Sequence, residues 1–128
     1  MDTDKGYAIR TKTSMSHERA VASAREALQH KGYGVLSELD IQTKLDEKLG
    51  VQREPYTILG ACNPPLANRG LEAEPEFGTL LPCNVVVYVQ DGATHVAAVE
   101  PRTMLSMVDN ADLGQIAARM REDLEAVG

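Results

Sequence analysis

Tryptophan is absent from this chain of 128 residues, phenylalanine occurs once and tyrosine four times. The hydrophobic core must therefore be built mainly from Val, Leu, Ile, Ala and Met, and it carries few specific aromatic contacts. A chain of this length, with 43% hydrophobic and 25% charged residues, can bury roughly two-thirds of its unfolded surface in one core. We therefore expect one globular domain over residues 1–128.

Basic residues are outnumbered and scattered. The chain has 13 Lys and Arg against 19 Asp and Glu, a formal net charge of −6, and no run of Lys or Arg exceeds two residues. Nonspecific affinity for nucleic acids comes mostly from Lys and Arg side chains that neutralise phosphates. The composition therefore argues against a nucleic-acid partner.

Long hydrophobic runs are also missing. No apolar stretch approaches the roughly 20 residues that a membrane-spanning helix needs. The N-terminal sequence MDTDKGYAIR carries acidic residues where a signal peptide has a basic segment followed by an apolar one. We therefore expect a cytoplasmic protein without a membrane partner, in which the two cysteines are reduced thiols unless they serve redox or metal chemistry.

The first part of the chain changes from strand to helix periodicity. Residues 7–13 alternate between polar and apolar and predict a strand. Residues 14–32 carry apolar residues at helical spacing, with Ser14 or Ser16 available as the N-cap and Gly32 as the stop.

A second strand and a short helix are predicted next. Residues 33–41 alternate again and predict a strand that returns across the first helix. Its residues on one face are expected to be Val35, Ser37, Leu39 and Ile41. Residues 40–50 suggest a short surface helix, with Asp40 as its cap and Gly50 as its stop.

A third strand leads directly to the first cysteine. Residues 55–62 read as this strand, which ends at Cys62. Asn63 is a preferred N-cap residue and Pro64 suits the first position of a helix. We therefore expect one or two helical turns over residues 64–74.

A β-hairpin is the strongest local prediction. Asp91-Gly92 is the preferred pair for a two-residue type I′ turn between β-branched runs. Counting back from this turn pairs Tyr88 with His95 and places Cys83 opposite Glu100. The face expected to be dry carries Cys83, Val85, Val87, Val89, Val96 and Ala98. The other face carries Asn84, Val86, Tyr88, His95, Ala97 and Val99.

Two helices are predicted after the hairpin, a short one opened by Pro101 and a longer one over residues 110–127. Two long amphipathic helices on one face of a mostly antiparallel sheet make a two-layer α+β domain. The valines and alanines of the other face make that face rather apolar, so we expect a homodimer to bury it.

The segments GACNP, residues 60–64, and LLPCNVVV, residues 80–87, lie in a chain that resembles the bacterial and archaeal family called domain of unknown function 302. The resemblance extends from about Tyr7 to Val127. It implies an α+β fold similar to the TATA-box-binding-protein-like arrangement, a strand and a helix followed by four strands and a helix, and it implies a homodimer. It implies no activity, no catalytic residues and no DNA binding, since function depends on the site. The positions that carry these family marks are Cys62, Asn63, Pro64, Pro82, Cys83 and Asn84.

The two cysteines are the candidate site. Cys62, just before the Asn63 cap, would lie near the positive end of a helix, a setting that lowers the pKa of a thiol. The alternative is that Cys62 is a small buried hydrophobe that ends a strand. Cys83 by itself would more often belong to the core, beside Glu100. If the two meet, a disulfide would add about 3 kcal/mol in the chain-entropy model and, in the cytoplasm, would act as a switch.

Metal binding by these thiols would need further ligands. Two thiolates do not complete a tetrahedral zinc site, although a dimer could supply two from each chain. A soft ion such as Cu(I) could use both cysteines with Met104 or Met107. Methionines three residues apart on a helix are nevertheless more often core filler.

Catalytic motifs are missing from the sequence. No Ser-His-Asp order, phosphate-binding glycine loop, HExxH motif or dinucleotide fingerprint appears. His95 opposite Tyr88 could serve as a proton donor or a ligand, but a cross-strand pair at a dimer seam is the preferred explanation. Two hypotheses therefore stand ahead of an enzyme. The first is a homodimeric module that uses Cys62 and Cys83 for soft-metal binding or redox switching. The second is an interaction domain for an apolar ligand or a protein partner, with both cysteines inert.

Overall fold

The computed structural model describes residues 6–127; residues 1–5, on which the argument against a signal peptide partly rests, and residue 128 lie outside the described part. Its elements, in chain order, are β1 (Ala8–Thr13), α1 (His17–His30), β2 (Gly34–Asp40), α2 (Ile41–Leu49), β3 (Tyr56–Cys62), α3 (Pro64–Ala73), the 3₁₀ helix η1 (Pro75–Leu80), β4 (Cys83–Gln90), β5 (Ala93–Val99), α4 (Pro101–Leu105) and α5 (Asp112–Glu125).

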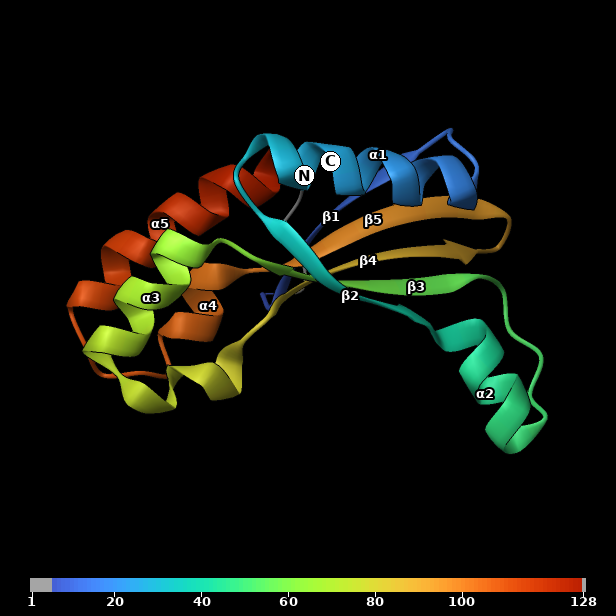
Figure 1. Ribbon diagram of the computed structural model, residues 1–128. Helices are drawn as coiled ribbons and strands as arrows, with labels where there is room; N and C mark the ends of the chain where they lie inside the picture. Colours follow the sequence, from blue (N-terminus) through green and yellow to red (C-terminus); the bar gives the residue numbers. More distant parts are fainter. Residues whose placement is uncertain (1–5, 128) are drawn as a thin grey trace.

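The strands form one sheet in the order β1-β5-β4-β3-β2, and every neighbouring pair is antiparallel. Figure 1 shows α1 lying along one face of this sheet, with α2 beyond one end and α3, α4 and α5 gathered at the other. The predicted two-layer α+β class is confirmed.

Side-chain caps set the helix starts where the sequence predicts them. The Ser16 hydroxyl accepts a hydrogen bond from the backbone N–H of Arg19 at the start of α1. The Asp40 carboxylate does the same for Thr43 at the start of α2. Gly50 ends α2 with φ of 68°, a left-handed conformation that costs glycine little. These starts and stops are decided locally, within one turn of the chain.

The hairpin of β4 and β5 has the predicted register. Tyr88 faces His95, and Asp91 and Gly92 have φ values of 52° and 79°, the positive values that a type I′ turn requires. The Glu54 carboxylate accepts hydrogen bonds from both turn N–H groups, at 3.0 and 3.2 Å. The face that begins with Cys83 is the more buried one, as expected.

The face prediction for β2 was wrong because the strand contains a bulge. Val35 pairs with Ala61, but Ser37, and not Leu36, pairs with Gly60. The extra residue turns Val35 toward α1 and moves Ser37 to the opposite face. Leu36 is left 70% exposed, and Ile41 begins α2 instead of ending the strand.

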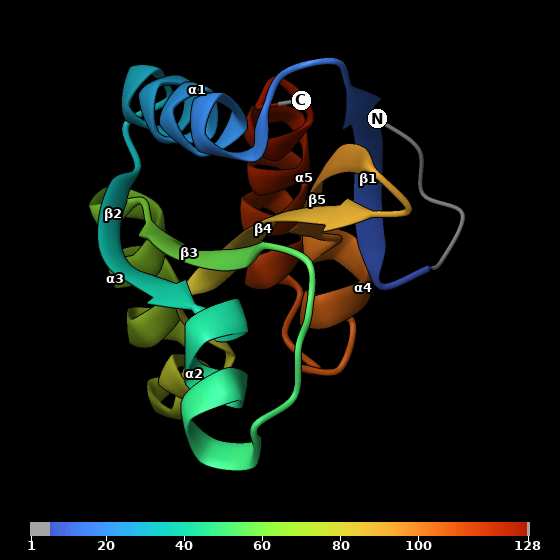
Figure 2. The same ribbon diagram turned by 90° about the vertical axis from the view of Figure 1, so that its right-hand side faces the viewer.

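Two buried clusters share the interior. The first lies between α1 and the sheet, where Ala24 and Leu28 pack with Leu59 and Val85. The second joins α3, η1, α4 and α5. Figure 2 shows α1 and α5 crossing at an angle, and in Figure 1 most of α5 lies beyond the end of the sheet, beside α3 and α4. The two long helices therefore do not cover the sheet equally: only the C-terminal part of α5, at Leu124 and beyond, enters the first cluster.

The sheet face opposite α1 is not crossed by any helix of the described chain (Figure 1). Tyr56, Tyr88 and His95 form a row of stacked rings there, with ring centroids 5.5 and 5.0 Å apart. A shallow hollow of about 200 Å³ beside this row is lined partly by Val86 and Ala97. Within residues 6–127, no helix combines the length and the apolar character that a membrane span requires.

Candidate functional site

The end of β3 carries the first cysteine into the start of α3. Cys62 is the last residue of the strand, and the Asn63 side chain accepts a hydrogen bond from the backbone N–H of Leu66 at 3.1 Å. The Asn63 amide also donates to the carbonyl of Lys31 at 3.5 Å, so it holds α3 beside the end of α1. The predicted cap is confirmed, with Pro64 as the first helical residue, but α3 has ten residues instead of one or two turns.

The start of β4 is placed by close packing on β3. A Cβ on Gly60 would lie 2.9 Å from Cγ of Pro82 and would overlap the Ser37 hydroxyl. Only glycine at this position lets Pro82 approach so closely. Pro82 is followed by Cys83, which faces Ala61 across the strands and is 2% exposed.

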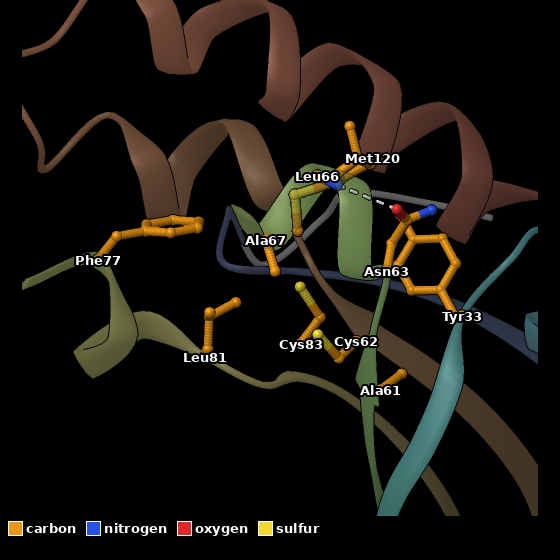
Figure 3. Close-up of a pocket in the computed structure, with 10 residues that line it drawn as sticks. All are labelled: Tyr33, Ala61, Cys62, Asn63, Leu66, Ala67, Phe77, Leu81, Cys83 and Met120. Atoms are coloured by element: carbon orange, nitrogen blue, oxygen red, sulfur yellow. Dashed lines mark hydrogen bonds between the residues drawn. The ribbon is translucent and has the colours of Figure 1, made fainter. Parts of the chain in front are cut away.

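Both cysteines line one small cavity, which is shown in Figure 3. Its volume is about 10 Å³, enough for roughly one water molecule. Cys62 is partly exposed and Cys83 is buried, so a reagent or ion from solvent would meet Cys62 first. The lining comes from β3, α3, η1, β4, α5 and the flanking loops: Tyr33, Ala61, Cys62, Asn63, Leu66, Ala67, Phe77, Leu81, Cys83 and Met120.

The buried thiol is a poor acid. Burial, and secondly the charge of Cys62, raise the pKa of Cys83 from 9.0 to about 12. Cys83 is therefore protonated at neutral pH in the free protein. A cation that replaced the proton would make Cys83 a thiolate near neutral pH.

The strand geometry does not favour a direct disulfide. Cys83 is paired with Ala61, so Cys62 is one residue out of register and does not lie directly opposite Cys83. A disulfide needs Cβ atoms that face each other at about 3.8 Å. Both cysteines are free in the structure. Two thiols that line one cavity could both reach a third atom placed in it.

The methionine at this cavity is not the one that the sequence suggested. Met104 packs at the edge of the second cluster, Met107 is 70% exposed, and neither lines the cavity. Met120 of α5 does line it, and it is 3% exposed. In the sequence, Met120 belongs to the apolar stripe of α5, and this pattern predicts core packing but not a place at the cavity.

A buried polar group closes one side of the cavity. The Tyr33 hydroxyl donates to the carboxylate of Asp123 at 3.1 Å, and Arg119 donates to the same carboxylate. Burial and the neighbouring Asp123 raise the pKa of Tyr33, so the hydroxyl keeps its proton. No local sequence signal marks this pair, because Tyr33 and Asp123 lie 90 residues apart in the chain.

Glu100 has a structural role instead of a place at the cavity. Its carboxylate accepts hydrogen bonds from Arg102 at 2.7 Å and from Arg121 at 2.9 Å, which ties α4 to α5. Burial alone would raise the pKa of Glu100, but the two arginines outweigh it and hold the pKa below its ordinary value. Asn84 lies on the open sheet face, away from the thiol cavity.

Metal ligands of the ordinary kind do not gather here. Among residues 6–127 no group of three or more His, Cys, Asp or Glu side chains could hold a metal ion. The cavity instead presents sulfur atoms within an otherwise largely apolar wall.

The chain has a clear relative among solved structures. The crystal structure of an uncharacterized conserved protein DUF302 from Bacillus stearothermophilus shares 31% sequence identity and superposes with a TM-score of 0.88, over 94% of each chain. A comparison with curated proteins gives no match. The family model described as domain of unknown function DUF302 matches residues 9–128. The chain belongs to the DUF302 family, as the GACNP and LLPCNVVV segments predicted.

Proposed function

We propose that this protein is a small cytoplasmic homodimer that binds a soft metal ion through Cys62 and Cys83. The observation that carries the proposal is that these two thiols, from neighbouring strands, line the same cavity. Thiolates are the ligands that soft ions prefer. The partly exposed Cys62 offers the ion a way in, and the buried Cys83 offers a site shielded from water.

The size of the cavity favours an ion over an organic ligand. Pockets for small organic molecules usually measure about 300–1,000 Å³, whereas this cavity measures about 10 Å³. The one-residue offset between Cys62 and the register partner of Cys83 argues against a redox switch by direct disulfide formation. Metal binding is therefore the better use of the two thiols.

The homodimer is supported by the open sheet face. Its centre carries Val86 and Ala97, and its row of rings runs across three strands. Burial of such a face in a second copy removes apolar surface from water. Sedimentation velocity is the test: the wild type should sediment as a dimer and Val86→Asp as a monomer. Ala118→Asp, at an exposed position of α5, is the control and should remain dimeric. A wild-type monomer would contradict this part of the proposal.

Metal binding is tested with reduced, metal-free protein under anaerobic conditions. Cu(I) and Zn²⁺ are each added in competition with a chromogenic chelator, and the bound metal is counted per chain. Wild type should take up one ion per chain, and the ion should protect both thiols from alkylation. Cys62→Ser and Cys83→Ala should each bind more weakly, and the double variant should not bind. Alanine is used at position 83 because a serine hydroxyl would be buried there without a partner.

The competing function is an interaction domain with inert cysteines. In that case the double variant would match wild type in every metal measurement and would differ only in stability. Urea unfolding of each variant shows whether it is folded before its binding is compared. Retained metal binding in a folded double variant would refute the thiol site.

A further inference from the structure

We infer that the ion is Cu(I) and that the thioether of Met120 is its third sulfur ligand. This inference rests on the metal-binding function proposed above and adds the identity of the metal and a ligand from a different helix. The site would then consist of Cys62 from β3, Cys83 from β4 and Met120 from α5.

Met120 is placed at the cavity by the packing of α5. The neighbouring residues Ile116 and Ala117 are buried in the second cluster, and their packing fixes the position of α5 relative to α3 and α4. Met120 is 3% exposed and shares the cavity wall with both cysteines. Figure 3 shows its side chain reaching down from the helix toward the two thiols.

Core packing does not require a methionine at this position. A buried methionine is ordinarily a flexible filler, and a leucine would fill the same volume against Leu66 and Phe77. Here the thioether, the two thiols and a residual cavity occur together at one place. A site for an ion requires these features, whereas a filled core does not.

The ligand set selects Cu(I) over Zn²⁺. Zinc takes four ligands from cysteine, histidine and carboxylates, or three with a water. No third group of these kinds joins the thiols among residues 6–127. The polar groups beside the cavity are already engaged, because Asn63 caps α3 and Tyr33 donates to Asp123. Thiolate and thioether sulfur are the donors that favour Cu(I).

The surroundings also suit a low-coordinate ion. Leu66, Phe77 and Leu81 form the apolar part of the wall, and the first two of them are buried. Such a wall offers few polar partners for the water that zinc would need as a remaining ligand. Cu(I) accepts a few sulfur ligands in a dry site.

The decisive variant is Met120→Leu, a volume-conserving change that leaves both thiols in place. Met107→Leu is the matched control, because Met107 is 70% exposed and lies outside the cavity. Loss of a direct ligand should cost at least as much as loss of an outer-shell partner, so Met120→Leu should weaken Cu(I) binding about 10-fold or more. Met107→Leu should bind as wild type does.

X-ray absorption at the copper edge reports the ligands directly. The wild type should show three sulfur neighbours and Met120→Leu should show two. In a protein labelled with selenomethionine, a copper–selenium path should appear, and it should vanish in Met120→Leu. The labelled wild type tests the ligand without any substitution, so the inference does not depend on whether the variant folds.

The outcomes separate this inference from the function on which it rests. If the cysteine variants lose Cu(I) but Met120→Leu keeps wild-type affinity and no copper–selenium path appears, Met120 is not a ligand and the two-thiol function stands. Three sulfur neighbours in Met120→Leu would mean that a second copy supplies the third sulfur, which also overturns the inference. Tighter binding of Zn²⁺ than of Cu(I) overturns the metal identity. If no cysteine variant alters metal uptake, the proposed function fails as well.

Discussion

Cys83 should react far more slowly in the folded protein than in the unfolded chain. The attacking species in alkylation is the thiolate. A rise in the pKa of Cys83 from 9.0 to about 12 lowers its thiolate fraction near neutral pH about 10³-fold. We therefore expect iodoacetamide to modify Cys83 in the native protein about 10³-fold more slowly than in the unfolded chain.

The pH dependence follows from the same value. The rate at Cys83 should rise about tenfold for each unit of pH and should not level off near pH 9, where an ordinary thiol does. Since burial is the larger cause of the raised pKa and the charge of Cys62 the smaller, Cys62→Ser should preserve most of the protection. Cys62 itself is partly exposed and should be modified first.

The assay uses reduced, metal-free protein, quenched at intervals and digested, with each cysteine peptide followed by mass spectrometry. The same reaction in denaturant gives the reference rate for each thiol. Modification of native Cys83 at the reference rate, or a rate that levels off near pH 9, would show that burial does not control this thiol. The reasoning about a protected inner ligand would then be wrong.

Three further predictions concern the framework around the site. A Cβ on Gly70 would overlap the ring of Phe77, so Gly70→Ala should lower the free energy of unfolding by about 1–3 kcal/mol in urea. Gly114→Ala, with open space around its Cβ, should instead raise it by about 0.5–1 kcal/mol; equal effects would refute the steric argument. Tyr33→Phe removes the hydrogen bond that the Tyr33 hydroxyl donates to the buried carboxylate of Asp123. It should lower the free energy of unfolding by about 1.5–3 kcal/mol. An unchanged urea midpoint would show that this bond does not stabilise the fold. The pKa of Glu100 is lowered in the folded state, so its stabilisation is present above the ordinary pKa and is lost as the pH falls through the folded value. Glu100→Gln should flatten the acid side of the stability profile, and an unaltered slope would contradict this.

Short-range chemistry explains the parts of the fold that could be predicted from sequence. The turn at Asp91-Gly92 and the caps at Ser16, Asp40 and Asn63 each depend on residues within a few positions. Because the turn sets the register, the buried face of β4 and β5 followed from the turn alone. The bulge at Leu36 could not be predicted in this way. It is a shift in the pairing of β2 with β3, and no residue near Leu36 in the sequence indicates it.

The candidate site also has a part that local sequence predicts and a part that depends on tertiary packing. The sequence by itself determined that Cys62 precedes a helix cap and that Cys83 begins the drier side of a strand. Only the tertiary structure decided that the two thiols share one cavity and that Met120, rather than Met104 or Met107, lies beside them. Periodicity reports which side of a helix is apolar, but it does not report which element that side will meet. The packing of α5 against α3, which no local rule sets, places a third sulfur next to the two thiols.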